Sequence, residues 1–276
     1  GFLNMKILML CSSQGNQKAL AHKINNAVGL DYLILCNYKN KYRKTFYKFM
    51  LIIWAKLSTI LTFFIFRRTW FKMLNYYDFQ FKYFPITPKL IVEDINNIAV
   101  INLVKKIKPD LVVVSGTNLL SPDLINEIHS HGKVMNLHTG ISPYVKGGPN
   151  CTNWCLFLRE FYLIGNTIMW LDRGIDSGNI IATERTPLTG NETLIELHIK
   201  VMEHAHSLYI RSIEMFFKDK KLPNVSQNNF IINRLFLSKH WGLYQMVIAI
   251  FNYYIYYFEG NIFLNKKDYV ILVDVN

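Results

Sequence analysis

Two short segments of the chain carry side chains suited to proton transfer and to the stabilisation of negative charge. Asn136 and His138 lie two residues apart in the segment NLHTGISPY, and Asp176 follows 38 residues after His138 in a glycine-containing turn. Residues two apart on a strand point to the same face of the sheet. An amide can donate a hydrogen bond to a developing oxyanion, and an imidazole can accept a proton. A hydrogen-bonded core pair and a turn-capping carboxylate would account for the same residues.

The cysteines and clustered histidines do not indicate a metal site. The cysteines form no CxxC pair, and histidines two residues apart diverge by about 200° around a helix. We therefore expect no metal, and we expect reduced, buried thiols in a cytoplasmic protein, consistent with the lack of a signal-peptide pattern. The residues concerned are Cys11, Cys36, Cys151, Cys155, His198, His204 and His206.

The elements around Asn136 and His138 alternate between apolar strands and helices. Continuous apolar runs are typical of strands covered on both faces, and strands separated by helices favour parallel βαβ units. The sequence thus predicts an α/β fold with a doubly wound, mostly parallel Rossmann-like sheet, whose ligands bind at the carboxyl ends of the strands. We expect strands at Lys6–Cys11, Tyr32–Cys36, Leu111–Val114 and Val134–Leu137, and helices at Ala19–Val28, Ile98–Ile107 and Pro122–His131.

The remainder of the chain predicts a boundary near Pro223. Before this boundary we expect a strand pair at Thr167–Leu171 and Ile180–Thr183 and a long helix at Glu192–Phe217. Beyond it, strands and helices no longer alternate. We expect a catalytic domain over 5–222, interrupted by an aromatic and basic insert over about 38–90, and a small helical or irregular appendage over 223–276.

Composition excludes a disordered or fibrous chain, because 51% of the 276 residues are hydrophobic and 18% are charged. The net charge of +12 favours an anionic partner: nucleic acid, an acidic membrane surface or a phosphorylated small molecule. Phe49–Phe66 is apolar on one helical face, and Lys56 in its middle disfavours a membrane span. The segment is therefore expected to form a helix that packs on the core or lies on an anionic membrane. The aromatic helix expected at Trp241–Phe258 would pack on the domain or form a homodimer interface.

The run NLHTGISPYVKGGPN, followed by TIMWLDRGIDSGNII, resembles the N10-formyltetrahydrofolate-dependent formyltransferases. That family includes methionyl-tRNA, phosphoribosylglycinamide and nucleotide-sugar formyltransferases. Its pattern is Asn-x-His at a strand end, a proline-containing loop with glycine, and an Asp-x-Gly turn, and the likeness extends roughly over Met5–Phe217. Some members carry Ser where Gly140 stands and a basic pair before Gly147, whereas here Lys146 stands alone.

The resemblance implies a mechanism and a cosubstrate for the three polar residues. An amine would attack the formyl carbon of N10-formyltetrahydrofolate, with no metal and no covalent intermediate. Asn136 would hold the oxyanion, His138 would accept the amine proton or, protonated, stabilise the oxyanion, and Asp176 would orient His138 or a water. Folate contacts are expected from Asn118, Leu119, Leu120, Leu124, Ile125, Asp172 and Ile175.

The acceptor implied by the resemblance is the amino group of a nucleotide-linked amino-dideoxy sugar, such as dTDP-4-amino-4,6-dideoxyglucose, used for O-antigen, lipopolysaccharide or other surface polysaccharide synthesis. Methionyl-tRNA members carry a further folded domain, and only 54 residues follow Leu222, so we expect no nucleic-acid partner. The segment Ser12–Asn16 lies before a helix, where amide groups can receive a phosphate. Acceptor contacts are expected from Ser13, Tyr144, Lys146, Asn150 and Trp154.

Three other functions stay open at this point. A methionyl-tRNA or glycinamide ribonucleotide formyltransferase would use the same polar residues on a different amine. A formyltetrahydrofolate hydrolase would use water in place of the amine. A non-catalytic protein of the membrane surface would depend on the aromatic helices and the basic charge, and it would not bind folate.

Overall fold

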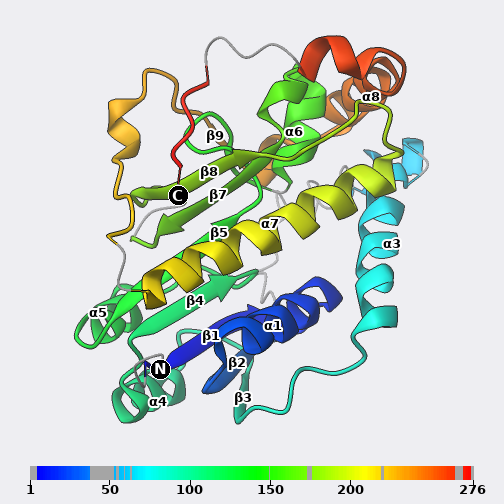
Figure 1. Cartoon of the computed structure of the whole chain (residues 1–276). Coiled ribbons are helices and arrows are strands. Elements are labelled where there is room, and N and C mark those ends of the chain that lie inside the picture. The colour runs from blue at the N-terminus through cyan, green and yellow to red at the C-terminus, as the bar shows by residue number, and fades with distance from the viewer. Residues whose placement is uncertain are drawn as a thin grey trace.

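A computed structural model describes residues 5–37, 53, 56–58, 60–62, 64–148, 150–172, 176–218, 221–264 and 270–274. Eight of the 18 residues of the helix expected at Phe49–Phe66, and residues 38–52 of the expected insert, lie outside these residues. A central twisted sheet runs through the molecule, with helices on both faces (Figure 1).

The sheet has seven strands in the order β3-β2-β1-β4-β5-β7-β8, and the first five are parallel. β7 and β8 pair antiparallel at the far edge. The mostly parallel, doubly wound α/β fold expected from the sequence is therefore confirmed. The strands are β1 (Ile7–Ser12), β2 (Tyr32–Cys36), β3 (Lys89–Val92), β4 (Leu111–Ser115), β5 (Lys133–His138), β7 (Gly165–Trp170) and β8 (Ile180–Arg185).

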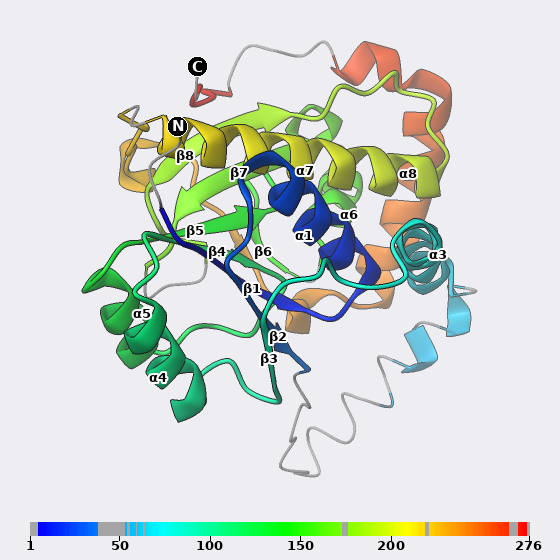
Figure 2. The same cartoon turned by 60° about the horizontal axis from the view of Figure 1, so that its bottom comes forward.

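Helices cover the two faces of the sheet, and each face has its own hydrophobic core. Alternate strand residues explain this division, since Ile7 and Met9 of β1 pack with α1 and α7, whereas Leu8 and Leu10 pack with α4 and α5. Figures 1 and 2 show α1 and α7 on one side of the sheet and α4 and α5 on the other. These helices are α1 (Gly15–Val28), α4 (Ile98–Ile107), α5 (Pro122–His129) and α7 (Leu194–Phe217).

Local sequence signals determine several helix boundaries. Ser121 caps α5 and Pro122 occupies its first turn, where a missing N–H costs nothing. Thr193 and Glu196 form a capping box that starts α7 two residues later than expected. β3 was not predicted, because this edge strand has only four residues and runs across the end of the expected insert.

Residues beyond 222 pack against the sheet domain. β9 (Leu235–Phe236) pairs with β6 (Lys146–Gly147), Val225 bridges to Ile180, and the Val273 amide donates to Thr183. α8 (Leu243–Leu264) packs on α6 (Cys151–Leu158), and α3 (Ile65–Gln80) packs on α1 and α7. No helix in the described part of the chain is both long and apolar enough to cross a membrane.

Candidate active site

A cavity of about 110 Å³ opens at the carboxyl ends of β4 and β5, where a doubly wound sheet places its ligands. Asn136, near the end of β5, forms part of its wall together with Asp176. The other lining residues are Val114, Gly116, Thr117, Asn118, Leu119, Leu120, Met169, Trp170, Leu171, Asp172, Ser177 and Gly178.

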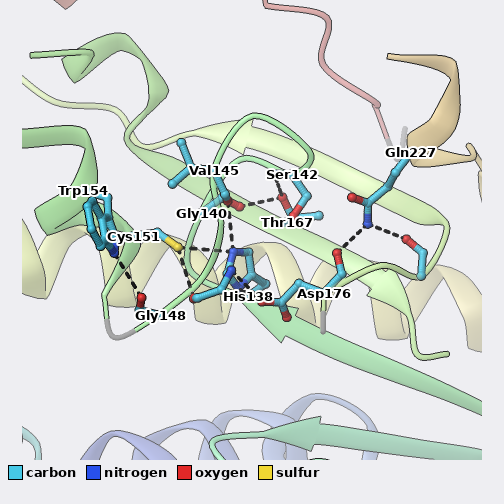
Figure 3. Close-up of polar contacts among 12 residues, drawn as sticks. His138, Gly140, Ser142, Val145, Gly148, Cys151, Trp154, Thr167, Asp176 and Gln227 are labelled. Carbon is cyan, nitrogen blue, oxygen red and sulfur yellow. Dashed lines mark hydrogen bonds and ion pairs between the residues drawn. The ribbon is translucent and has the colours of Figure 1, made fainter. Parts of the chain in front are cut away.

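His138 and Asp176 lie side by side next to this cavity (Figure 3). His138 Nδ1 is 3.3 Å from Asp176 Oδ2, and both side chains are largely buried. Asp176 lines the cavity, and His138, which does not line it, contacts the Asp176 carboxylate. The structure thus brings together the three residues that the sequence selected, with Asn136 and Asp176 at the surface of the cavity.

The other ring nitrogen of His138 faces a backbone carbonyl and a thiol. Nε2 lies 3.2 Å from Val145 O and 3.4 Å from Cys151 Sγ. A carbonyl oxygen can only accept, so this contact places a hydrogen on Nε2. Nδ1 is then the ring nitrogen that faces the Asp176 carboxyl, so a proton can pass between the two groups.

Gly147 closes a ring of contacts around this pair. Its N–H donates to Asp176 Oδ2 at 3.0 Å, and its carbonyl accepts from Cys151 Sγ at 3.5 Å. Burial raises the pKa of the Cys151 thiol well above its usual range, with Cys155 and Asp176 adding to the shift, so Cys151 stays protonated and acts as a donor. The sequence predicted no role for Cys151 beyond that of a buried thiol, and only its place beside the recognised motif could have indicated one.

Gly140 leaves room for the imidazole of His138, and Thr167 holds the loop that contains Gly140. A Cβ on Gly140 would lie 2.7 Å from His138 Nε2 and 2.9 Å from Cys151 Cβ, so no larger residue fits without movement. Thr167, which pairs with His138 across β5 and β7, donates to the Gly140 carbonyl at 2.6 Å and accepts from the Ser142 amide. The loop after β5 is therefore fixed by the neighbouring strand.

The turn that contains Asp176 accepts hydrogen bonds from a residue beyond the predicted catalytic domain. Asp176 has a φ of 47°, in the left-handed region that Asp and Asn tolerate better than most residues. Gln227 donates to the carbonyls of Asp176 and Gly178 at 2.8 and 2.7 Å. No sequence signal pointed to Gln227, because it lies 51 residues further along the chain in a segment without a motif.

The residues expected to contact folate divide into three groups. Asn118, Leu119, Leu120 and Asp172 line the cavity. Leu124 and Ile125 lie in the core behind Leu120, and Ile175 lies outside the described residues. A flat bicyclic ring needs apolar walls and a polar edge, and the cavity offers both, in Leu119, Leu120 and Met169 and in the Asn136 and Asp172 side chains. The residues present fit a folate.

The residues expected to contact the acceptor are dispersed. Ser13 is exposed and precedes α1. Its neighbour Ser12 lies close to Gly116 of the cavity wall, since a Cβ on Gly116 would lie 3.4 Å from Ser12 Oγ. Lys146 is buried near Asp176; burial lowers its pKa, against the opposing effect of Asp176 and Asp172. Tyr144 and Trp154 are buried in one core cluster, and Asn150 caps α6. Of these five residues, only Lys146, near Asp176, and Ser13, next to Ser12, lie near residues that line the cavity.

Across the described ranges, no group of three His, Cys, Asp or Glu residues could hold a metal ion.

Comparison with known proteins assigns the region that contains the site. Residues 88–213 match the formyl transferase family, and Asn136, His138 and Asp176 all lie within this match. This segment belongs to the formyl transferase family. A methionyl-tRNA formyltransferase of Alkaliphilus oremlandii is 31% identical over 131 residues, which cover 47% of this chain and 41% of that protein. The chain thus spans about two fifths of such a curated relative in the alignment.

Solved structures of formyl transferases share the fold. An N-formyltransferase from Helicobacter canadensis, in complex with folinic acid and dTDP-3-aminofucose, superposes with a TM-score of 0.55 at 16% identity, covering 90% of this chain and 80% of that chain. Phosphoribosylglycinamide formyltransferase from Streptococcus pneumoniae superposes with a TM-score of 0.51 at 16% identity, covering 77% of this chain and 99% of that chain. At these identities the comparison concerns the fold of the formyl transferase domain.

Proposed function

We propose that this protein is an N-formyltransferase that moves the formyl group of N10-formyltetrahydrofolate to the amino group of a nucleotide-linked amino-dideoxy sugar. The observation that supports the proposal is that an amide side chain and a His–Asp pair meet at the same cavity. Asn136 and Asp176 line that cavity, and His138 lies 3.3 Å from the Asp176 carboxylate.

Each of the three residues has a role that follows from its position. When the amine nitrogen attacks the formyl carbon, the carbonyl oxygen gains negative charge, and the amide of Asn136, which lines the cavity, would donate a hydrogen bond to it. The attacking nitrogen must lose a proton, and the folate nitrogen must gain one as its bond to the formyl carbon breaks. Asp176 lines the cavity and contacts His138, so the pair would accept the proton that the amine loses and deliver a proton to the folate nitrogen.

Two features favour a phosphorylated acceptor. Gly116 connects the cavity to the start of α1, whose first turn contains no acidic residue and whose N-cap, Gln14, makes no side-chain hydrogen bond. Amides at a helix start attract phosphate oxygens. The chain also carries a net charge of +12, which suits a diphosphate.

The structural comparison favours a sugar among the acceptors. The Helicobacter canadensis N-formyltransferase, which binds dTDP-3-aminofucose, is matched over 90% of this chain, and the phosphoribosylglycinamide enzyme over 77%. The curated sequence relatives favour a second candidate, methionyl-tRNA, which would also suit a basic protein. These two acceptors make different demands on the same site.

An acceptor panel tests the proposal. The full chain is incubated with N10-formyltetrahydrofolate and, separately, with dTDP- and GDP-linked 3-amino and 4-amino sugars, glycinamide ribonucleotide, methionyl-tRNA or no acceptor, and products are read by mass spectrometry. Formylation of an amino sugar alone supports the proposal. Formylation of methionyl-tRNA or glycinamide ribonucleotide keeps the chemistry and replaces the acceptor, whereas formate release without an acceptor identifies a hydrolase.

A further inference from the structure

One face of α8 presents a row of apolar side chains to solvent. The side chains are spaced three or four residues apart, so they share one side of the helix over about 27 Å. The opposite side of α8 packs on the domain through Ala249 and Tyr256, and the Asn252 amide donates to the carbonyls of Leu156 and Phe157. The exposed row consists of Tyr244, Val247, Phe251, Tyr254, Phe258 and Ile262.

The neighbouring helix α3 extends this row with apolar and basic side chains. Both views place α3 and α8 at the same end of the molecule, away from α4 and α5 (Figures 1 and 2). A groove of about 340 Å³ between them is lined by Arg68 and Lys72 of α3 and by Ile250 and Tyr254 of α8. The exposed half of α3 carries Arg67, Arg68, Phe71, Lys72, Tyr76 and Phe79, and together with the α8 row these form what we call the α3–α8 surface.

The charge of the α3–α8 surface is positive. Asp78, the acidic residue of α3, is paired with Lys18 of α1 at 2.7 Å, and Glu259 is the acidic residue of α8. Arg67, Arg68 and Lys72 therefore outnumber the unpaired acid on these two helices. A partner for this surface must bury aromatic and aliphatic side chains and also bring negative charge.

We propose that the α3–α8 surface binds reversibly to an anionic phospholipid membrane. Aromatic side chains are favoured at the level of the lipid head groups, where a ring can stay partly hydrated, and long basic side chains can reach the phosphates from the same face. A second copy of the chain is a poorer partner, because a two-fold contact would bring the same basic side chains of both copies together. Membrane binding goes beyond the proposed transferase activity and does not depend on it.

Vesicle binding by the full chain tests this proposal. We expect co-sedimentation with vesicles of phosphatidylglycerol and phosphatidylcholine in equal parts, little with phosphatidylcholine alone, and weaker binding at high salt. Each basic side chain near an anionic surface strengthens binding about fivefold, so a double variant Arg67→Gln/Arg68→Gln should weaken it about 25-fold. Phe251→Gln/Phe258→Gln should weaken it as well, because it removes apolar area from the row.

Matched controls lie on α4, on the far side of the molecule. Lys105→Gln/Lys106→Gln removes two basic side chains, and Ile98→Gln removes one exposed apolar side chain, so both should bind vesicles like the parent. Absence of binding to anionic vesicles would overturn the proposal, as would equal losses in the α3 and α4 charge variants. A dimer in light scattering that Phe251→Gln/Phe258→Gln dissociates, without vesicle binding, would assign the surface to a second copy.

Discussion

Replacing Asp176 by Asn separates the charge of this side chain from its shape. The Asp176 carboxylate contacts His138 Nδ1 at 3.3 Å and accepts from the Gly147 N–H at 3.0 Å, both through Oδ2. An Asn oxygen at that place still accepts from Gly147. Asn also tolerates the φ of 47° at this position, which would strain Ala. Asp176→Asn is therefore expected to fold and to lose mainly the charge.

The expected loss of activity exceeds the expected loss of stability. Charge-assisted hydrogen bonds become neutral ones, which should lower the free energy of unfolding by about 1–2 kcal/mol. Proton transfer by a positioned group contributes about 10²–10⁴ in rate, or about 3–5 kcal/mol of the barrier. We expect kcat to fall by about that factor in Asp176→Asn, measured by mass spectrometry of the formylated acceptor, while thermal unfolding shows a folded protein.

A matched control is available in the same fold. Glu184 lies 3.0 Å from His204 and also binds Arg211, so Glu184→Gln breaks the same kind of pair away from the cavity. This variant should lose comparable stability and keep its turnover. A folded Asp176→Asn protein whose kcat stays within tenfold of the parent would refute the assignment of Asp176 to proton transfer.

Three further outcomes follow from other parts of the structure. Asn136→Ala removes the donor at the cavity and should lower kcat about 10²–10³-fold; near-normal turnover of the folded variant would contradict the role of Asn136. Gly140→Ala should lower both turnover and, by about 1–3 kcal/mol, stability, because its Cβ would lie 2.7 Å from His138 Nε2; unchanged melting and turnover would show that this loop can shift. Burial lowers the pKa of His198 to about 4, below the unfolded value of about 6.5, so stability is full above pH 6.5 and should fall by about 3 kcal/mol towards pH 4. Denaturant unfolding of His198→Leu should show a smaller fall over this pH window, and an identical fall would mean that other groups, such as the buried His206, carry it.

The sequence predicts those parts of the fold that have a strong local pattern. Continuous apolar runs identified β1, β2, β4 and β5, because this signal needs no information from distant residues. β3 escaped prediction, since a four-residue edge strand acquires its structure by pairing with β2.

The site divides in the same way. Asn136 and His138 were found because a strand places residues two apart on one face, and Asp176 was found through the resemblance of its turn to a known family. The supports of these residues were not found. Cys151 and Gln227 act through contacts that span 13 and 49–51 residues of chain, and such contacts leave no periodic trace in the sequence.

The pairing of β6 with β9 has a consequence for engineering. Gly147 belongs to β6, and a Cβ there would lie 2.1 Å from the Phe236 carbonyl of β9, so the two backbones are held in close approach. The same glycine donates to Asp176, and Gln227 holds the turn of Asp176 from behind. Residues 88–213 thus do not hold Asp176 in place by themselves: a graft or truncation that omits residues 227–236 would remove Gln227 and the strand that pairs with Gly147, while leaving every residue of the recognised motif in place.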